Sequence, residues 1–248
     1  MYYLDREEEI LKILKSKDVV ENAELSSRLY VSMQTIRRDL DKMEEKGLVI
    51  RRHGAVSLNY QMLDQNIPFE QREQLYVEEK QIIAAKAMEF VRDNDVVFLD
   101  GATTAAALVP SLASKKNLIV VTNGAKTALR LSNLGIRTIS TGGRLLQSNL
   151  TMVGSEAIRT VKEYNANVCF FSSTTLTDSG HLTDNWTEIT DVRRAMMEQS
   201  DLRVFLCVSD KFRKKAKINY AHLSEVDEII SETDVPEEYR SMMRKKRL

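Results

Sequence analysis

Cysteine, proline and tryptophan are scarce in this sequence, which has two, three and one of them among 248 residues. Cys169 and Cys207 each lie in an apolar, strand-like run, so we expect two small buried thiols and no disulfide framework. Long apolar runs are also missing. Residues 96–99 and 118–121 are typical of the longest, whereas a membrane span needs about 20 apolar residues. The sequence therefore predicts no membrane-crossing helix.

An excess of one charge is missing as well, because 36 Lys and Arg balance 36 Asp and Glu. The shares of hydrophobic residues (43%) and charged residues (29%) are those of a folded globular chain, which excludes a mainly disordered protein. Because the chain has no net charge, a binding site for nucleic acid must come from a local cluster of basic residues. Residues 1–9 carry four acidic side chains and no apolar core of a secretory signal, so we expect a cytoplasmic protein.

Glycine and proline are absent from the first 46 residues, which favours helices there. Apolar spacing predicts one helix from a cap at Asp5 to near Lys17, a second capped by Asn22, and a third capped by Ser32. The third carries its apolar residues on one face and ends in a helix-terminating glycine: Ile36, Leu40, Met43 and then Gly47.

Residues 48–58 follow as two β-favouring runs split by His53 and Gly54, which is typical of a hairpin. Three helices and a hairpin predict a winged helix-turn-helix domain over residues 1–58, followed by a polar linker at 59–76. From residue 77 to 248, strand-like runs at 96–99, 118–121, 137–140, 168–171 and 204–208 alternate with helical ones. This predicts a doubly wound, mostly parallel α/β domain.

Charge within the first domain is uneven. Residues 1–27 hold four basic and seven acidic residues, net −3, whereas residues 28–58 hold seven and four, net +3. In a helix-turn-helix, the third helix enters the major groove and the wing contacts the backbone. The candidate contacts with double-stranded DNA are Ser32, Gln34, Thr35, Arg37 and Arg38 on that helix and Arg51, Arg52 and His53 on the wing. The alternative is a solvated helix face on which Arg37 and Arg38 pair with Asp41 and Glu45.

Residues 31–40, Val-Ser-Met-Gln-Thr-Ile-Arg-Arg-Asp-Leu, together with Gly-Leu-Val-Ile-Arg-Arg-His-Gly-Ala at 47–55, closely resemble the N-terminal domain of DeoR-type bacterial repressors. The family usually has two glycines after the histidine, where this chain has Gly54 and Ala55. The resemblance implies a regulator that binds operator DNA.

A second motif, Phe-Leu-Asp-Gly-Ala-Thr-Thr-Ala at residues 98–105, joins a predicted strand to a predicted helix. Free N–H groups at a helix start, Gly101 and the hydroxyls of Thr103 and Thr104 suit a phosphate, although a simple capped helix start is an equal alternative. Residues 122–124 and 141–144 end two further strands, so three polar loops should meet at one sheet edge, with Arg144 as a charged clamp.

The resemblance extends through this half, whose family counterpart is similar in fold to ribose-5-phosphate isomerase and binds phosphorylated sugars. It implies an effector pocket formed by Asp100, Gly101, Thr103, Thr104, Thr122, Asn123, Gly142, Gly143 and Lys211. Two departures are Ala102, where the family usually has a second glycine, and the segment around Thr174. Lys211 has an alternative role as one member of a solvated lysine cluster with Lys214, Lys215 and Lys217.

Together these features predict a cytoplasmic repressor of a carbohydrate-metabolism operon that is controlled by a phosphorylated sugar and acts as a homodimer or homotetramer. We expect no cofactor and no metal, because His181 and His222 lack further ligands at metal spacing. One competing function is a sugar-phosphate isomerase-like enzyme that uses Asp100, Asp178 and Lys211. The other is a DNA-binding protein whose effector pocket has degenerated.

Overall fold

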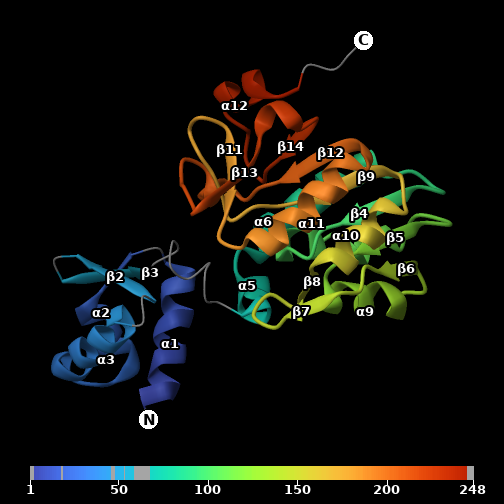
Figure 1. The fold of residues 1–248 in the computed structure, drawn as a ribbon. Helices are drawn as coiled ribbons and strands as arrows, with labels where there is room; N and C mark the ends of the chain where they lie inside the picture. Colours follow the sequence, from blue (N-terminus) through green and yellow to red (C-terminus); the bar gives the residue numbers. More distant parts are fainter. Residues whose placement is uncertain (1–2, 18, 46–47, 53, 59–67, 245–248) are drawn as a thin grey trace. The chain divides into compact units, whose positions relative to one another are not determined.

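The computed structural model describes residues 3–17, 19–45, 48–52, 54–58 and 68–244 (Figure 1). Its contacts divide the chain into two compact units, Met1–Ile67 and Pro68–Leu248, which are described here one at a time. Helix α5 (Phe69–Gln74) lies inside the stretch expected to be a linker and belongs to the second unit.

The first unit contains three helices and a small antiparallel sheet of strand order β1-β3-β2. Its elements are α1 (Tyr3–Ser16), β1 (Val19–Glu21), α2 (Asn22–Leu29), α3 (Met33–Glu45), β2 (Val49–Arg52) and β3 (Ala55–Leu58). Ile36, Leu40 and Met43 are fully buried, as their spacing predicts. The predicted hairpin is present, and β1, which sequence spacing did not reveal, pairs with β3 as a third strand. This arrangement is a winged helix-turn-helix.

The three expected helix caps had different outcomes. Asp5 does not cap α1, so that prediction was wrong: the helix begins at Tyr3 and Asp5 lies in its first turn. Ser32 caps α3 as predicted, because its Oγ accepts a hydrogen bond from the backbone N–H of Thr35 at 3.2 Å. Asn22 does not cap α2, so that prediction was wrong. It is the first helical residue, its side chain is buried, and Glu21 occupies the cap position. The expected stop at Gly47 lies outside the described residues.

The second unit is built on a six-stranded sheet in which every pair is parallel. The order is β14 (Glu228–Ile230), β12 (Ser200–Leu206), β9 (Ala166–Phe171), β4 (Val96–Leu99), β5 (Ile119–Thr122) and β6 (Arg137–Ser140). Alternate side chains enter two separate cores, with Phe98 and Phe171 in one and Val97 and Phe170 in the other. The near-continuous apolar runs of β4, β5 and β9 follow from burial on both faces.

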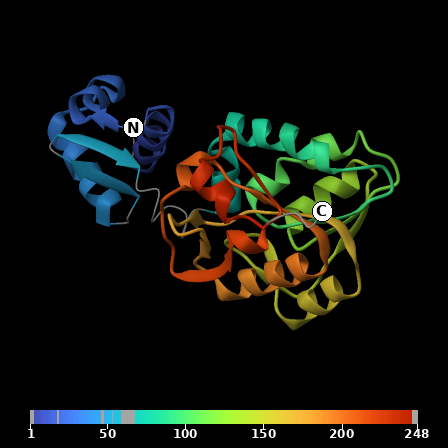
Figure 2. The same cartoon turned by 90° about the horizontal axis from the view of Figure 1, so that it is seen from above.

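Helices cover both faces of this sheet, which confirms the doubly wound prediction (Figure 2). One core includes residues of α10 (Ser155–Lys162), α11 (Thr187–Glu198) and α12 (Glu237–Met242). The other includes residues of α6 (Val77–Ala87), α7 (Thr103–Ala106), α8 (Val109–Leu112) and α9 (Ala125–Asn133). The single helix expected from residue 105 is two short helices, α7 and α8. No described helix is long and apolar enough to span a membrane.

Smaller strands and turns lie at the ends of the main strands, and the sequence did not predict them. One is an antiparallel sheet of β10 (Thr175–Leu176), β11 (His181–Asp184) and β13 (Ile218–His222), and another is the pair β7 (Arg144–Leu146) and β8 (Thr151–Val153). Three single turns complete the unit: η1 (Met88–Phe90), η2 (Ser209–Lys211) and η3 (Leu223–Glu225). Cys169 and Cys207 are free, fully buried thiols, and burial raises the pKa of Cys207 to about 12.

Candidate DNA interface and ligand site

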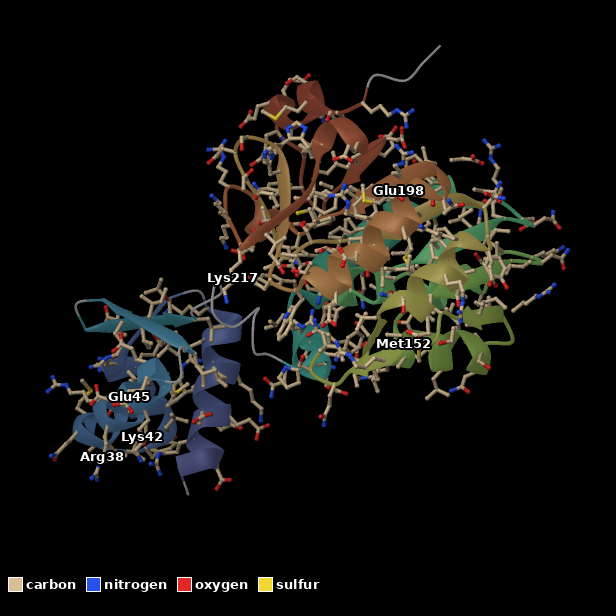
Figure 3. All side chains as sticks on the ribbon, in the orientation of Figure 1. Arg38, Lys42, Glu45, Met152, Glu198 and Lys217 are labelled. Atoms are coloured by element: carbon tan, nitrogen blue, oxygen red, sulfur yellow. The ribbon has the colours of Figure 1, made fainter. Side chains whose placement is uncertain are left out.

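The outer face of α3 presents polar and cationic side chains to solvent. Gln34, Arg37 and Arg38 are exposed, and Thr35 is half-buried next to the cap Ser32. Figure 3 shows Arg38 and Lys42 on this helix, one turn apart. Arg37 and Arg38 form no ion pair with another described residue, so the alternative in which Asp41 and Glu45 neutralise them has no support in the contacts. The face therefore has guanidinium groups available for an anionic partner.

On the wing, one of the expected contact residues also has partners within the unit. Arg51 on β2 forms an ion pair with Asp41 of α3 and lies 3.7 Å from the carboxylate of Glu44, so its charge is partly neutralised within the unit. Arg52 ends β2, opposite Ala55 in the register. His53 lies outside the described residues. Arg51 links the wing to α3, a role that the sequence did not suggest.

A buried ion pair fixes α3 against α1. Arg6 donates from Nε to Asp39 Oδ2 at 2.7 Å and from its Nη2 to Oδ1 at 3.0 Å. The Asp39 side chain is 3% exposed and that of Arg6 is 14% exposed. Two parallel bonds define an orientation as well as a distance, because the guanidinium and carboxylate planes must align. This pair holds the polar face of α3 outward while its apolar face is packed.

In the second unit, the carboxyl ends of β4 and β5 meet as predicted. The N–H of Gly101 donates to Asn123 Oδ1 at 2.9 Å, and Asn123 Nδ2 donates to the carbonyl of Met152 on β8 at 3.3 Å. A Cβ on Gly101 would lie 2.8 Å from Thr151 Oγ1, which explains the glycine. These hydrogen bonds therefore hold the loops after β4 and β5 together next to β8.

Four hydroxyl-bearing residues of this edge are buried: Thr103, Thr104, Thr122 and Thr141. Ala102 has φ −71° and ψ 147°, an extended backbone that any residue adopts. The alanine in place of the family's second glycine therefore introduces no strain. This removes one of the two reasons for considering the pocket degenerate.

Asp100 is the centre of a buried charge cluster. Arg193 on α11 donates from Nε to Asp100 Oδ2 at 2.9 Å and from Nη1 to Asp184 Oδ2 at 2.8 Å, and all three residues are at most 5% exposed. Burial opposes the charge of Arg193, but Asp100 and Asp184, together with the adjacent Tyr220 ring at 5.0 Å, raise its pKa above the ordinary value. One guanidinium group thus serves two carboxyl groups.

Two buried polar atoms at this cluster have no partner within the described part of the chain: Asp100 Oδ1 and Ser172 Oγ. They belong to neighbouring strand ends, since the N–H of Ser172 approaches Asp100 Oδ2 at 3.4 Å. A buried polar atom without a hydrogen bond costs about 1 to 3 kcal/mol. The pair is thus suited to a molecule that supplies a hydroxyl group, which can donate to one atom and accept from the other.

Lys211 lies with the strand ends. Its Nζ donates to the carbonyl of Ser173, just after β9, at 2.8 Å, whereas Lys214 pairs with Asp210, and Lys215 and Lys217 are exposed. The turn that carries Lys211 is held by Glu232, which accepts a hydrogen bond from the backbone N–H of Ser209. Lys211 is therefore separated from the surface cluster.

The glycine loop after β6 shows why two glycines are needed there. Gly142 and Gly143 have φ of +66° and +101°, and a Cβ on Gly143 would lie 2.6 Å from the carbonyl oxygen of Val153. Arg144 follows on β7, largely exposed, and pairs with Glu188 of α11. Its role as a clamp stays a prediction. Within the described residues, no cluster of His, Cys, Asp and Glu could hold a metal ion.

Sequence spacing missed Arg193 and Asp184. The available signal was a cation within the apolar stripe of α11, since Ile189, Val192 and Met196 are buried around Arg193. A charged residue on a packed helix face requires a buried partner.

Comparison with known protein families is consistent with a DNA-binding first unit and a ligand-binding second unit. Residues 6–62 match a model described as DeoR-like helix-turn-helix domain, and residues 76–233 match one described as DeoR C terminal sensor domain. The chain belongs to the DeoR family of transcriptional regulators. This regulator is similar to the "Uncharacterized HTH-type transcriptional regulator YulB" of Bacillus subtilis, with 32% identity over 94% of the chain and 90% of that protein.

The regulator is also 27% identical to the glycerol-3-phosphate regulon repressor of Escherichia coli, over 95% of the chain and 93% of that protein. Among solved structures, translation initiation factor eIF-2B of Pyrococcus horikoshii matches with TM-score 0.50 and 14% identity, over 89% of this chain and 84% of that one. A D-ribose-5-phosphate isomerase matches with TM-score 0.43 and 14% identity, over 55% and 54%. The regulator is not an enzyme: it binds DNA through its helix-turn-helix and a small-molecule effector through its sensor domain.

Proposed function

We propose that this regulator represses an operon of carbohydrate metabolism in the cytoplasm and that a phosphorylated sugar controls it. The observation that carries the proposal is the pair of unpartnered buried atoms, Asp100 Oδ1 and Ser172 Oγ, beside Lys211 at the strand ends. The first two suit sugar hydroxyls, and the ammonium group suits a phosphate or another anion. The name of the glycerol-3-phosphate regulon repressor supports the same class of ligand.

The DNA-binding half of the proposal assigns base contacts to Gln34, Arg37 and Arg38 and phosphate contacts to Ser32, Thr35 and the wing residues Arg51, Arg52 and His53. Side chains of the first group are exposed at the N-terminal part of α3, where a recognition helix contacts base edges. One winged domain buries too little surface for tight specific binding, so the proposal includes a homodimer or homotetramer that presents paired domains.

Control follows from linkage between the two sites. An effector that binds one arrangement of the oligomer better than the other shifts the population by its difference in affinity, typically by about 1 to 3 kcal/mol. The DNA-binding free energy changes by the same amount, with a sign that depends on which arrangement the effector prefers.

The test is fluorescence anisotropy of the full chain on DNA from upstream of its own gene, at fixed salt, titrated with sugar phosphates and their unphosphorylated parents. We expect a phosphorylated sugar to change operator affinity while its parent has little effect, and Lys211→Met to abolish that difference. Indifference to the whole panel, or an equal response to the unphosphorylated parents, would contradict the proposed effector.

For the DNA half, Arg38→Ala should weaken operator binding by about 1 to 3 kcal/mol, because it removes a base contact. The fold should be unaffected, since Arg38 is exposed and forms no ion pair with a described residue. Lys12→Ala is the matched control, because it removes one exposed cation from α1. Equal operator affinity of both variants would remove Arg38 from the reading face.

A further inference from the structure

Tyr30 adopts a backbone conformation that a tyrosine rarely takes. It follows α2 with φ 53° and ψ 41°, the left-handed region that favours glycine. The turn is fixed on both sides: the N–H groups of Tyr30 and Val31 both donate to the carbonyl of Ser26, and Ser26 Oγ donates to the carbonyl of Val31 at 2.6 Å. The tyrosine is therefore held in a strained conformation that glycine would adopt without cost.

The hydrogen bonds of the helix end hold this backbone conformation, but they do not explain why the residue is a tyrosine. The residue is 95% exposed, and its side chain has no hydrogen bond to a described residue. Tyr76 is an instructive contrast, because it has the same left-handed φ of 53° but packs against a core of the sensor unit. Residues that the surrounding structure holds in sparsely populated backbone regions concentrate at functional sites. Tyr30 thus has the features of a contact residue whose side chain has no partner among the described residues.

Its position indicates the partner. Tyr30 precedes the α3 cap, Ser32, by two residues, and the first turn of a recognition helix enters the major groove. The chain just before that turn passes the rim of the groove, which consists of phosphate groups. A phenolic hydroxyl is among the groups that donate to phosphate oxygens in protein–DNA complexes. An exposed aromatic ring on a rigid turn also loses little conformational freedom on binding.

We propose that Tyr30 is a DNA-backbone contact, whose hydroxyl donates a hydrogen bond to a phosphate at the edge of the groove that α3 enters. The inference rests on α3 being the reading helix. A phosphate contact carries no sequence information, so its effect is the same on operator and on unrelated DNA. This distinguishes it from the base contacts assigned to Arg38.

The experiment compares Tyr30→Phe and Tyr30→Gly with the wild-type full chain. Phenylalanine keeps the ring and the strained backbone and removes only the hydroxyl, whereas glycine also relieves the strain. Two properties are measured at fixed salt: the affinity for a duplex from upstream of the gene and for a duplex of random sequence, and the thermal unfolding midpoint of the DNA-binding unit. Arg38→Ala is measured alongside both.

We expect Tyr30→Phe to weaken binding to both duplexes by about threefold to tenfold, as befits one hydrogen bond to a charged group that is partly exposed to water. Tyr30→Gly should bind at least as weakly as Tyr30→Phe, yet unfold at a midpoint about 4 °C or more higher, since the left-handed strain is gone. Greater stability with weaker binding is a combination that loss of fold cannot produce.

Wild-type affinity of Tyr30→Phe for both duplexes would overturn the proposal, and so would a loss confined to the upstream duplex, because that pattern belongs to a base contact. If Arg38→Ala also binds as wild type, the assignment of α3 as the reading helix fails. If Arg38→Ala is impaired and Tyr30→Phe is not, only the inference about Tyr30 fails.

Discussion

Replacing Arg193 with methionine should destabilise the sensor unit far more than a typical substitution. The guanidinium is the shared partner of Asp100 and Asp184, which are 1% and 5% exposed. Methionine fills similar volume but leaves two buried carboxyl groups without their shared cation. Removing one partner of a buried ion pair costs about 3 to 5 kcal/mol, and the loss of its stacking on Tyr220 adds to that.

The assay is urea unfolding of the full chain followed by tryptophan fluorescence. Trp186 is the only tryptophan and occupies the cap position of α11, the helix that carries Arg193, so its signal reports on the sensor unit alone. Arg194→Met is the matched control, because that neighbouring guanidinium donates to a single backbone carbonyl, that of Tyr220, at 2.6 Å. We expect this control to cost about 1 kcal/mol.

A second substitution tests whether repulsion between the two carboxylates causes the loss of stability. Asp184→Asn in the Arg193→Met background removes one of the two repelling charges, so the double variant should be more stable than Arg193→Met alone. Such non-additivity is expected only for groups in direct interaction. If Arg193→Met unfolds no earlier than Arg194→Met, or if Asp184→Asn recovers nothing, the cluster does not hold the unit together as described.

Two further predictions concern ion pairs that fix α3 and α5. Asp39→Asn removes the carboxylate that pairs with the nearly buried Arg6 and should lower the stability of the DNA-binding unit by about 2 to 3 kcal/mol, measured by circular dichroism. Burial opposes ionisation of Glu73, but hydrogen bonds from Arg130 and Lys126 lower its pKa below 4.5. Its stabilising contribution is therefore present above pH 4.5 and lost as the pH falls through its lowered pKa. The unfolding midpoints of wild type and Glu73→Gln should accordingly converge as the pH falls through that lowered pKa, and a constant difference would contradict the pairing.

Periodicity predicted the elements whose burial is regular. Strands β4, β5, β6, β9 and β12 are found close to the expected residues. For β4, β5 and β9 the reason is that apolar runs buried on both faces have few other solutions. β10, β11 and β13 have at most five residues each and mix polar with apolar side chains, so their pairing is set by tertiary contacts. Asn22 illustrates the same limit, since a good capping residue is used inside a helix.

Part of the candidate effector site could also be predicted from the sequence. Asp100, Gly101 and Asn123 follow parallel strands, and parallel strand ends share one edge of a sheet, so their convergence follows from topology. Arg193 comes from a helix on one face of the sheet, more than 90 positions along the chain from Asp100. Its partner is decided by how α11 packs, which no local pattern encodes.

The two cysteines have a practical consequence for studying this regulator. Cys169 and Cys207 are completely buried, and burial raises the pKa of both thiols, so neither presents the thiolate that reacts with maleimides. A cysteine introduced at an exposed position, such as Leu129 on α9, would then be the one site of labelling in the native protein. Fluorophores or spin labels can thus be attached without first building a cysteine-free background, and the sensor can be followed with its natural core intact.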